Sequence, residues 1–304
     1  MLADTKIILE KARRKNYAVA HFNINNLEIV QGVVAAAVKL KAPIILATSE
    51  GALNYAGMNY LYSIAKTASE LHQIPIALHL DHGKNLKAIR QAINLGYSSV
   101  MIDASHEKFE RNVRLTKKVV RWAHRKGVSV EAELGTIGGT EDLVSARKII
   151  YTNPEKAREF IDRTGCDFLA VAIGTSHGAY KFKGTAKLRI DLLKEIKNRT
   201  KIPLVLHGAS GVPKNVVKMA ERYGANLKGV QGVPDQQISL AVKNGINKIN
   251  TDTDLRIAFD AAVRNFLKGN PKDFDPRHIL APARDLIQKV AEQRIILFGS
   301  VKKG

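Results

Sequence analysis

The sequence predicts an α/β protein and, within that class, a single (β/α)8 barrel of the TIM type. Eight short runs rich in β-branched and aliphatic residues recur along the 304-residue chain, and a longer segment with helical spacing follows each run. Several runs are apolar on both faces, as expected for parallel strands that helices cover. Because no Pro-, Gly- or Ser-rich linker divides these units, we expect one domain over residues 1–304.

The elements follow one another in a regular order. The eight predicted strands begin near Tyr17, Pro43, Ile74, Ser98, Val128, Asp167, Pro203 and Gly245. Between the first two strands, apolar residues at helical spacing predict an amphipathic helix, with Leu27, Val30, Val33, Val34 and Val38 on one face. Residues 1–16 mix charges into an apolar pattern and predict a further helix, not a signal peptide. Residues 269–304 add a proline-containing connection and a final amphipathic helix.

An open, doubly wound sheet is the alternative architecture. No G-x-G-x-x-G follows the first predicted strand, which argues against a dinucleotide site of that fold. No stretch approaches the roughly 18 uninterrupted apolar residues of a membrane span. The single cysteine, Cys166, excludes an internal disulfide and favours the reducing cytoplasm, with an inert, packed thiol.

The net charge of +20 is the most unusual compositional feature. A field of this sign favours polyanions, including nucleic acid and phosphorylated metabolites. However, the Lys and Arg residues are spread along helical segments, and no nucleic-acid-binding motif is visible. We therefore interpret the charge as a solvated basic surface and expect no specific nucleic-acid partner.

Polar side chains end every predicted strand, and in such a barrel these ends carry the chemistry. In strand order they are His21 and Asn23; Ser49 and Glu50; Asp81 and His82; Asp103 and His106; Glu131 and Glu133; Ser176 and His177; His207 and Ser210; and Asn250, Asp252 and Asp254. Three ends place histidine before glycine, at His82, His177 and His207. A structural hydrogen bond would explain one such histidine, whereas three at one mouth predict a metal site.

Three imidazoles with one open position form the ligand set of a catalytic zinc ion, which acts as a Lewis acid on a carbonyl or enediolate oxygen. Asp81, next to His82, is a candidate for orienting substrate or donating a proton. Asp103 and Glu133 are candidates either for a second, weaker cation site or for support of a ligating histidine. His79 lies deeper in the strand, and we assign it to packing.

Glycine-rich turns follow several strands. The motifs "GTSHG", "HGASG" and "NTDT" offer backbone N–H groups to a phosphate, although glycine also serves tight turns. Residues 135–153 are too long for a plain turn. With Gly138–Gly139 and Glu141–Asp142 they suit a mobile lid that carries a general acid/base, or an exposed loop whose carboxylates have no role.

These motifs together resemble one family, the class II (metal-dependent) fructose-bisphosphate aldolases and their tagatose-bisphosphate relatives. The resemblance runs from "FNINNLE" near residue 22 to "DPR" at 275–277, through "ALHLDHG", "SVMIDASH", "VSVEAELGTIGG", "GTSHG", "LHGASG" and "INKINTDTDLR". It implies a barrel lyase that reversibly cleaves fructose 1,6-bisphosphate to dihydroxyacetone phosphate and glyceraldehyde 3-phosphate, in glycolysis and gluconeogenesis. Tagatose 1,6-bisphosphate is the alternative substrate, and a basic nucleic-acid-binding barrel protein is a distant alternative.

The resemblance also implies residue roles. It makes His82, His177 and His207 the ligands of a catalytic Zn²⁺, and it places a second divalent cation at Asp103 and Glu133, with a monovalent cation as a further expectation. Asp81 would handle the C4 hydroxyl proton, and Glu141 the proton on the dihydroxyacetone phosphate carbon. The implied substrate contacts are Asn23, Ser49, Gly178, Lys181, Gly208, Ser210, Asn250, Asp252, Thr253 and Arg277. Because Arg277 would come from a neighbouring subunit, we expect a homodimer or homotetramer, in the cytoplasm.

The chain departs from the family pattern in three places. Lys84 begins a "KNLKAI" stretch where a small hydroxyl residue and an acidic residue are usual, "GASG" replaces "GGTG", and residues 224–236 look like an insertion. None of these changes removes an implied ligand, and they leave the sugar preference open.

Overall fold

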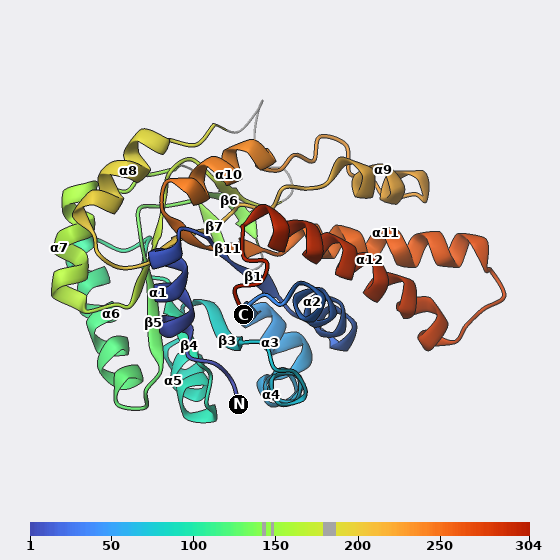
Figure 1. The fold of residues 1–304 in the computed structure, drawn as a ribbon, viewed down its shortest axis with the longest axis horizontal. Helices are drawn as coiled ribbons and strands as arrows, with labels where there is room; N and C mark the ends of the chain where they lie inside the picture. The colour runs from blue at the N-terminus through green and yellow to red at the C-terminus, as the bar shows by residue number, and fades with distance from the viewer. Residues whose placement is uncertain (142–143, 147–148, 179–186) are drawn as a thin grey trace.

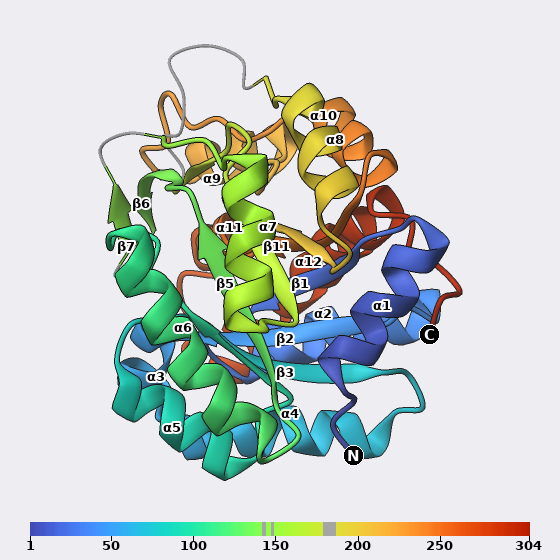
Figure 2. The same cartoon turned by 90° about the vertical axis from the view of Figure 1, so that its left-hand side faces the viewer.

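Eight parallel strands close into a barrel in the order β1, β2, β3, β4, β5, β8, β10 and β11, and helices surround it (Figures 1 and 2). The computed structural model describes residues 1–304 except 142–143, 147–148 and 179–186, and for residues 140, 141, 144–146 and 177 it describes the backbone alone. The predicted (β/α)8 barrel is confirmed. None of the helices in these described ranges is long and apolar enough to cross a membrane.

Each barrel strand lies within one of the eight predicted runs. The strands are β1 (Val19–Asn23), β2 (Ile44–Ser49), β3 (Ile76–Gly83), β4 (Ser99–Ile102), β5 (Ser129–Leu134), β8 (Phe168–Val171), β10 (Leu204–Leu206) and β11 (Ile246–Thr251). The helices are α1 (Thr5–Lys15), α2 (Leu27–Leu40), α3 (Glu50–Ala56), α4 (Met58–Leu71), α5 (Leu86–Leu95), α6 (Phe109–His124), α7 (Pro154–Thr164), α8 (Ile190–Arg199), α9 (Lys214–Arg222), α10 (Asp235–Lys243), α11 (Thr253–Gly269) and α12 (Pro276–Leu297).

Short polar residues start several of the helices that follow strands. Ser49 both ends β2 and caps α3, since its Oγ accepts a hydrogen bond from Ala52 N at 3.1 Å. Asn85 caps α5 by accepting from Lys87 N. Such caps bind otherwise unpaired amides of the first helical turn, so the chain changes from strand to helix within a few residues. The connections after β2 and β3 are therefore short.

Helix α1 closes the N-terminal end of the barrel. Its Ile8, Leu9 and Ala12 pack in one buried cluster with residues that line the barrel interior, namely Val19, Ile45, Ala77, Phe168, Ala170 and Val205. The larger apolar cluster lies between the strands and the surrounding helices. Since apolar side chains and α1 fill one end, the polar strand ends at the opposite end form the open mouth.

A small second sheet lies outside the barrel order. It joins β6 (Gly138–Glu141), β7 (Val144–Ala146) and β9 (Ser176–His177) in the order β7, β6, β9. β6 and β7 pair in antiparallel fashion, and Gly139 of β6 lies in register with His177. The expected loop at 135–153 thus contains a β-hairpin, which places the backbone of Glu141 on the same small sheet as that of His177. Its role as a lid stays a prediction.

Helix α11 follows the eighth barrel strand, and α12 extends the chain beyond this eighth unit, as expected for residues 269–304. They lie side by side and project away from the strands (Figure 1). α12 also packs along α2, where a Cβ on Gly32 would lie 2.7 Å from Ile287 Cγ2. This glycine allows the two helices to approach closely. The final helix is therefore held against the barrel layer as well as against α11.

Candidate active site

The end of β3 bends at His82. This residue has a φ of 46°, in the left-handed region, and the pairing register between β3 and β4 shifts between Leu80 and Gly83. In a regular strand Asp81 and His82 would point to opposite faces. The bend removes this alternation, and ligand atoms of Asp81, His82 and His207 lie within 4.8 Å of one another. The bend therefore lets both Asp81 and His82 reach the mouth, as expected from the sequence.

The imidazoles of His82 and His207 face each other across the mouth. His82 Nε2 lies 2.8 Å from His207 Nδ1, and the rings are nearly perpendicular. Each ring's other nitrogen faces a carboxylate: His82 Nδ1 is 3.0 Å from Asp103 Oδ2, and His207 Nε2 is 2.6 Å from Glu131 Oε1. A carboxylate behind an imidazole is the usual arrangement around a metal-ligating histidine, because it fixes the tautomer and the ring orientation.

This geometry fits a divalent metal ion. Two nitrogens that face each other at 2.8 Å can share a single proton, and they converge as two ligands of one ion would. A carboxylate oxygen of Glu133 lies 3.8 Å from His207 Nδ1, and Asp103 and Glu133 form a second group of converging ligand atoms with His82. His177 is described by its backbone alone, in β9.

The carboxylates around His82 control its charge in the metal-free protein. Burial alone would lower its pKa, but the charge of Asp81 and the hydrogen bond and charge of Asp103 raise the pKa of His82 to about 10. Burial acts in the opposite sense on Asp103, yet His82 and Ser105 hold the pKa of Asp103 well below its ordinary value. Burial and the charge of Asp103 raise the pKa of Glu133 well above its ordinary value. The metal-free site therefore pairs a protonated His82 with an ionised Asp103.

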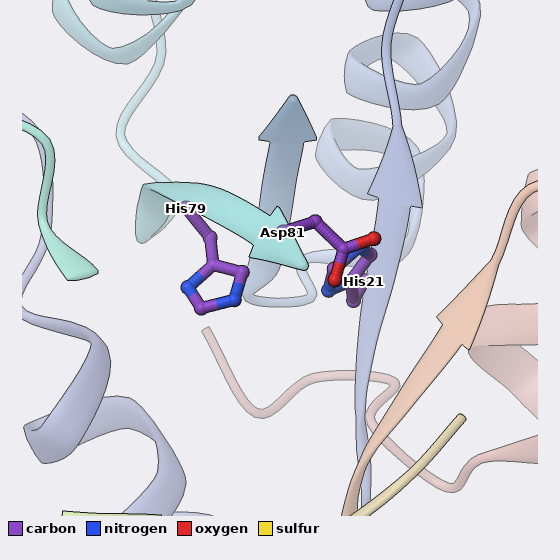
Figure 3. Close-up of side chains that lie close together, drawn as sticks. All are labelled: His21, His79 and Asp81. Carbon is purple, nitrogen blue, oxygen red and sulfur yellow. The ribbon is translucent and has the colours of Figure 1, made fainter. Parts of the chain in front are cut away.

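Asp81 is held in place by two asparagines from neighbouring strands. Asn23 Nδ2 donates to Asp81 Oδ2 at 2.9 Å, and Asn250 Nδ2 donates to Asp81 Oδ1 at 3.1 Å. The carboxylate is 4% exposed and lies beside the ring of His21 (Figure 3). Because each oxygen accepts an amide hydrogen, the carboxylate has a fixed orientation at the mouth.

Two buried histidines lie below Asp81 and are neutral. His21 Nε2 is 3.0 Å from Asn23 Oδ1, and its neighbour His79 has Nδ1 2.8 Å from the hydroxyl of Ser99 (Figure 3). Burial, with the nearby charge of Lys248, lowers the pKa of both rings well below the ordinary value. The expected packing role of His79 agrees with its burial against Phe168.

Sequence reasoning gave no role to two residues of this network, Glu131 and Lys248. Glu131 was noted only as polar near the end of β5, and Lys248 lies within β11. Both side chains are fully buried, and Lys248 Nζ is 2.8 Å from Glu131 Oε2. The available signal was the pattern "INKIN", in which a charged lysine lies within a predicted strand two residues before Asn250.

A glycine shapes the part of the mouth that the turns after β10 and β11 form. Gly208 has a φ of 61°, and a Cβ there would lie 2.6 Å from the carbonyl oxygen of Ser176. Ser210 Oγ accepts from Asp252 N at 3.4 Å, so the turns after β10 and β11 touch. Thr253, beside Asp252, is buried at the start of α11. The turns after β9, β10 and β11 thus form one surface.

Part of the "HGASG" backbone is already bound within the protein. Asp254, which is fully buried, accepts hydrogen bonds from Gly211 N at 3.2 Å and from Val212 N at 2.7 Å. These two amides are therefore committed to the fold. Asp252 is likewise engaged, since its carboxylate pairs with Arg256 at 2.6 Å.

The remaining expected site residues are placed as follows. Ser49 ends β2, in register with Asp81, and Gly178 has a φ of 82° directly after β9. Arg277 is not brought to this cluster: its exposed guanidinium pairs with Asp275 at the start of α12. Lys181 lies outside the described residues, and Glu141 is described by its backbone alone.

A closed (β/α)8 barrel whose mouth presents facing imidazoles backed by carboxylates defines a barrel enzyme of the metal-dependent class. The family model of class-II fructose-bisphosphate aldolases matches residues 3–303. The chain belongs to this family, whose members depend on a metal ion.

Relatives with similar sequences and a solved structure with a similar fold also carry the name aldolase. The chain is 49% identical over 302 residues to a fructose-bisphosphate aldolase of Giardia intestinalis, covering 98% of this chain and 93% of that protein. It is 48% identical over 303 residues to one of Thermus caldophilus, covering 99% of both. Among solved structures, the YdjI aldolase of Escherichia coli K12 superposes with a TM-score of 0.80 at 34% identity, covering 100% of this chain and 99% of that one.

Proposed function

We propose that this chain catalyses the reversible, metal-dependent cleavage of fructose 1,6-bisphosphate to dihydroxyacetone phosphate and glyceraldehyde 3-phosphate. The observation that carries the proposal is the 2.8 Å approach of His82 Nε2 to His207 Nδ1 beside the fixed carboxylate of Asp81. Relatives at 48–49% identity over nearly the whole chain are named fructose-bisphosphate aldolases, which supports the same substrate here.

In this proposal His82, His177 and His207 hold a catalytic Zn²⁺, since a set of imidazoles with an open position suits that ion. When bound, the ion supplies a Lewis acid that stabilises negative charge on a substrate oxygen. Asp103 and Glu131 orient the rings through Nδ1 of His82 and Nε2 of His207. Asp103 and Glu133 are the candidates for a second divalent cation, although the contact of Asp103 with His82 favours a supporting role for this carboxylate.

Asp81 is the proposed base for the C4 hydroxyl. Its two oxygens each accept one amide hydrogen, from Asn23 and from Asn250, so further lone pairs remain for a substrate proton. As the C3–C4 bond breaks, the hydroxyl proton moves to Asp81, which leaves the aldehyde product. Glu141 is the proposed donor of a proton to the dihydroxyacetone phosphate carbon after the aldehyde has left.

The proposed phosphate contacts form two groups. Gly178, Gly208, Ser210 and residues 250–253 would hold the dihydroxyacetone phosphate end, while Lys181 and Arg277 would bind the other phosphate. Because Arg277 lies on α12 away from the cluster, we propose that a neighbouring subunit supplies it in a homodimer or homotetramer. The proposed setting is the cytoplasm.

The test is an assay of fructose 1,6-bisphosphate cleavage before and after chelation, and after addition of Zn²⁺. We expect activity to be lost with the chelator, to return with Zn²⁺, and to be abolished in His82→Ala. His106→Ala is the matched control, because His106 also follows a strand but has a largely exposed ring, and it should keep activity. Cleavage that survives both chelation and His82→Ala would overturn the proposal.

The choice between two sugars needs a second measurement. Fructose and tagatose 1,6-bisphosphates differ in the configuration of one hydroxyl, so the ratio of kcat/KM for the two substrates reports their relative transition-state binding. We expect the higher kcat/KM with fructose 1,6-bisphosphate. A higher value with tagatose 1,6-bisphosphate would reassign the substrate while leaving the reaction class unchanged.

A further inference from the structure

Lys248 lies inside the barrel, where a cation is unexpected. Its side chain is 0% exposed. In the strand register it stands beside Val19 of β1 and Val205 of β10, which both belong to the apolar cluster of the barrel interior. An ammonium group without acceptors would be strongly unfavourable at such a position. The structure gives it two partners, an ion pair with Glu131 and a hydrogen bond to Asn250.

The ion pair with Glu131 leads to the proposed metal site. Lys248 Nζ lies 2.8 Å from Glu131 Oε2, while Glu131 Oε1 lies 2.6 Å from His207 Nε2. The two oxygens of one carboxylate are thus divided between the ammonium and the imidazole. Because Oε1 accepts the Nε2 hydrogen, His207 Nδ1 is left to face His82 and a metal ion.

The hydrogen bond to Asn250 leads to the proposed base. Lys248 Nζ donates to Asn250 Oδ1 at 2.9 Å, and Asn250 Nδ2 donates to Asp81 Oδ1 at 3.1 Å. An ammonium group can only donate hydrogen bonds, so it fixes which end of the Asn250 amide faces it. The amide hydrogens are therefore turned toward Asp81. On the other side of Asp81, His21 Nε2 lies 3.0 Å from Asn23 Oδ1, and Asn23 Nδ2 donates to Asp81 Oδ2 at 2.9 Å.

We propose that Lys248 is a positioning residue that sets the proposed metal ligand His207 and the proposed base Asp81 from one point, through Glu131 and Asn250. This inference rests on the proposed function, because it assigns the two ends of the network the roles given there. The competing interpretation is that Lys248 only balances the buried charge of Glu131. The two interpretations differ in what happens when both charges are removed together.

The experiment measures four quantities for each variant. The Kd for Zn²⁺ of the metal-free protein comes from competition with a chromophoric chelator, kcat and KM are measured at saturating Zn²⁺, and Tm reports stability. Lys248→Met removes the charge and all donors at similar length. We expect its Zn²⁺ Kd to rise at least about 10-fold, as for other residues that support metal ligands. We expect kcat to fall at least about 10-fold at saturating Zn²⁺ with a smaller change in KM, because Asp81 loses its orientation while the phosphate contacts remain.

The matched control is Thr48→Val. Thr48 is also fully buried in the barrel wall and makes one side-chain hydrogen bond, to the hydroxyl of Tyr97 at 3.1 Å, away from both branches of the network. Its loss should lower Tm while Kd and kcat stay within about twofold of the starting protein. If Lys248→Met changes Tm alone, as Thr48→Val should, the proposal fails.

The double variant Lys248→Met with Glu131→Gln separates positioning from charge balance. It contains no uncompensated charge, so we expect its Tm to recover even if Lys248→Met alone is unstable. Because Glu131→Gln by itself weakens the support of His207, the reference is Glu131→Gln alone: we expect kcat of the double variant to lie at least about 10-fold below that reference, since nothing orients Asn250. Equal kcat in the double variant and in Glu131→Gln would overturn the proposal in favour of charge balance. The starting protein is assayed alongside: absence of metal-dependent cleavage there counts against the proposed function, while an active starting protein with unaffected Lys248 variants counts against this inference alone.

Discussion

His82 Nε2 and His207 Nδ1 lie 2.8 Å apart, close enough to share one proton in the metal-free protein. Since the surrounding carboxylates raise the pKa of His82 to about 10 in spite of burial, this ring carries that proton at neutral pH. A metal ion bound by both nitrogens must displace it.

We therefore predict that binding of Zn²⁺ releases about one proton at pH 7. The measurement is titration calorimetry in buffers of different ionisation enthalpy, where the slope of the observed enthalpy gives the proton count. The apparent affinity should also rise about tenfold per pH unit below the pKa of His82. His82→Ala provides the control, and a slope near zero in the starting protein would contradict the prediction.

A second prediction concerns the stability of the metal-free protein. The folded-state pKa of His82 is raised from 6.5 to about 10, so the folded state binds a proton more tightly than the unfolded state does. The resulting stabilisation is fully present below pH 6.5 and is lost as the pH rises toward 10. Denaturant unfolding with a chelator present should show this decline between pH 6 and pH 10. In His82→Gln the decline should be smaller, and equal slopes in the two proteins would exclude His82 as its source.

A third prediction tests the carboxylate behind His82. Asp103→Asn keeps the shape of the side chain but removes the charge that orients and polarises the ring, so Zn²⁺ affinity should fall about 10- to 100-fold. Chelator competition measures this change. Ser105→Ala is the matched control, because the hydroxyl of Ser105 donates to Asp103 Oδ1 at 2.8 Å without touching His82. Its effect on Kd should be much smaller, and equal effects would mean that general packing dominates.

A fourth prediction separates two reasons for a glycine. Gly127 and Gly208 have similar φ values of 68° and 61°, but a Cβ on Gly127 meets nothing within 4 Å, whereas one on Gly208 would lie 2.6 Å from Ser176 O. Gly127→Ala should reduce the free energy of unfolding by about 1 kcal/mol through backbone strain. Gly208→Ala should reduce the free energy of unfolding by about 1–3 kcal/mol more than Gly127→Ala does, because the added Cβ forces Ser176 to move. We also expect it to lose activity. Comparable unfolding free energies for both variants would show that the turn at Gly208 adjusts freely.

Much of the fold was predictable because parallel strands covered by helices leave long apolar runs in the sequence. The strand ends were predictable for the same reason, since polar residues such as Asp81 and His207 break those runs at the mouth. The short strands of the β6–β7–β9 sheet were missed. They are only two to four residues long and rich in glycine, so they carry no periodic pattern.

The interior network was less accessible to sequence reasoning. Lys248 and Glu131 lie within strands and are 117 positions apart in the sequence, and nothing along the chain indicates that these two residues pair in space. The direction in which Asp81 points could not be predicted either. Side chains alternate between the two faces of a regular strand, but the left-handed backbone at His82 breaks this alternation. The roles of individual site residues remain predictions that the experiments above test.

The pairing of β1 with β11 has a consequence for how the molecule is made. This seam joins Val19 to Lys248, so it brings together an early and a late part of the chain. Contacts between such distant segments form slowly, and during synthesis this one must wait until β11 has left the ribosome. Lys248 reaches Glu131 only when the barrel closes. Until then Glu131, the carboxylate behind His207, lacks its partner. We therefore expect tight metal loading to follow closure of the barrel, which places metal acquisition late in biogenesis.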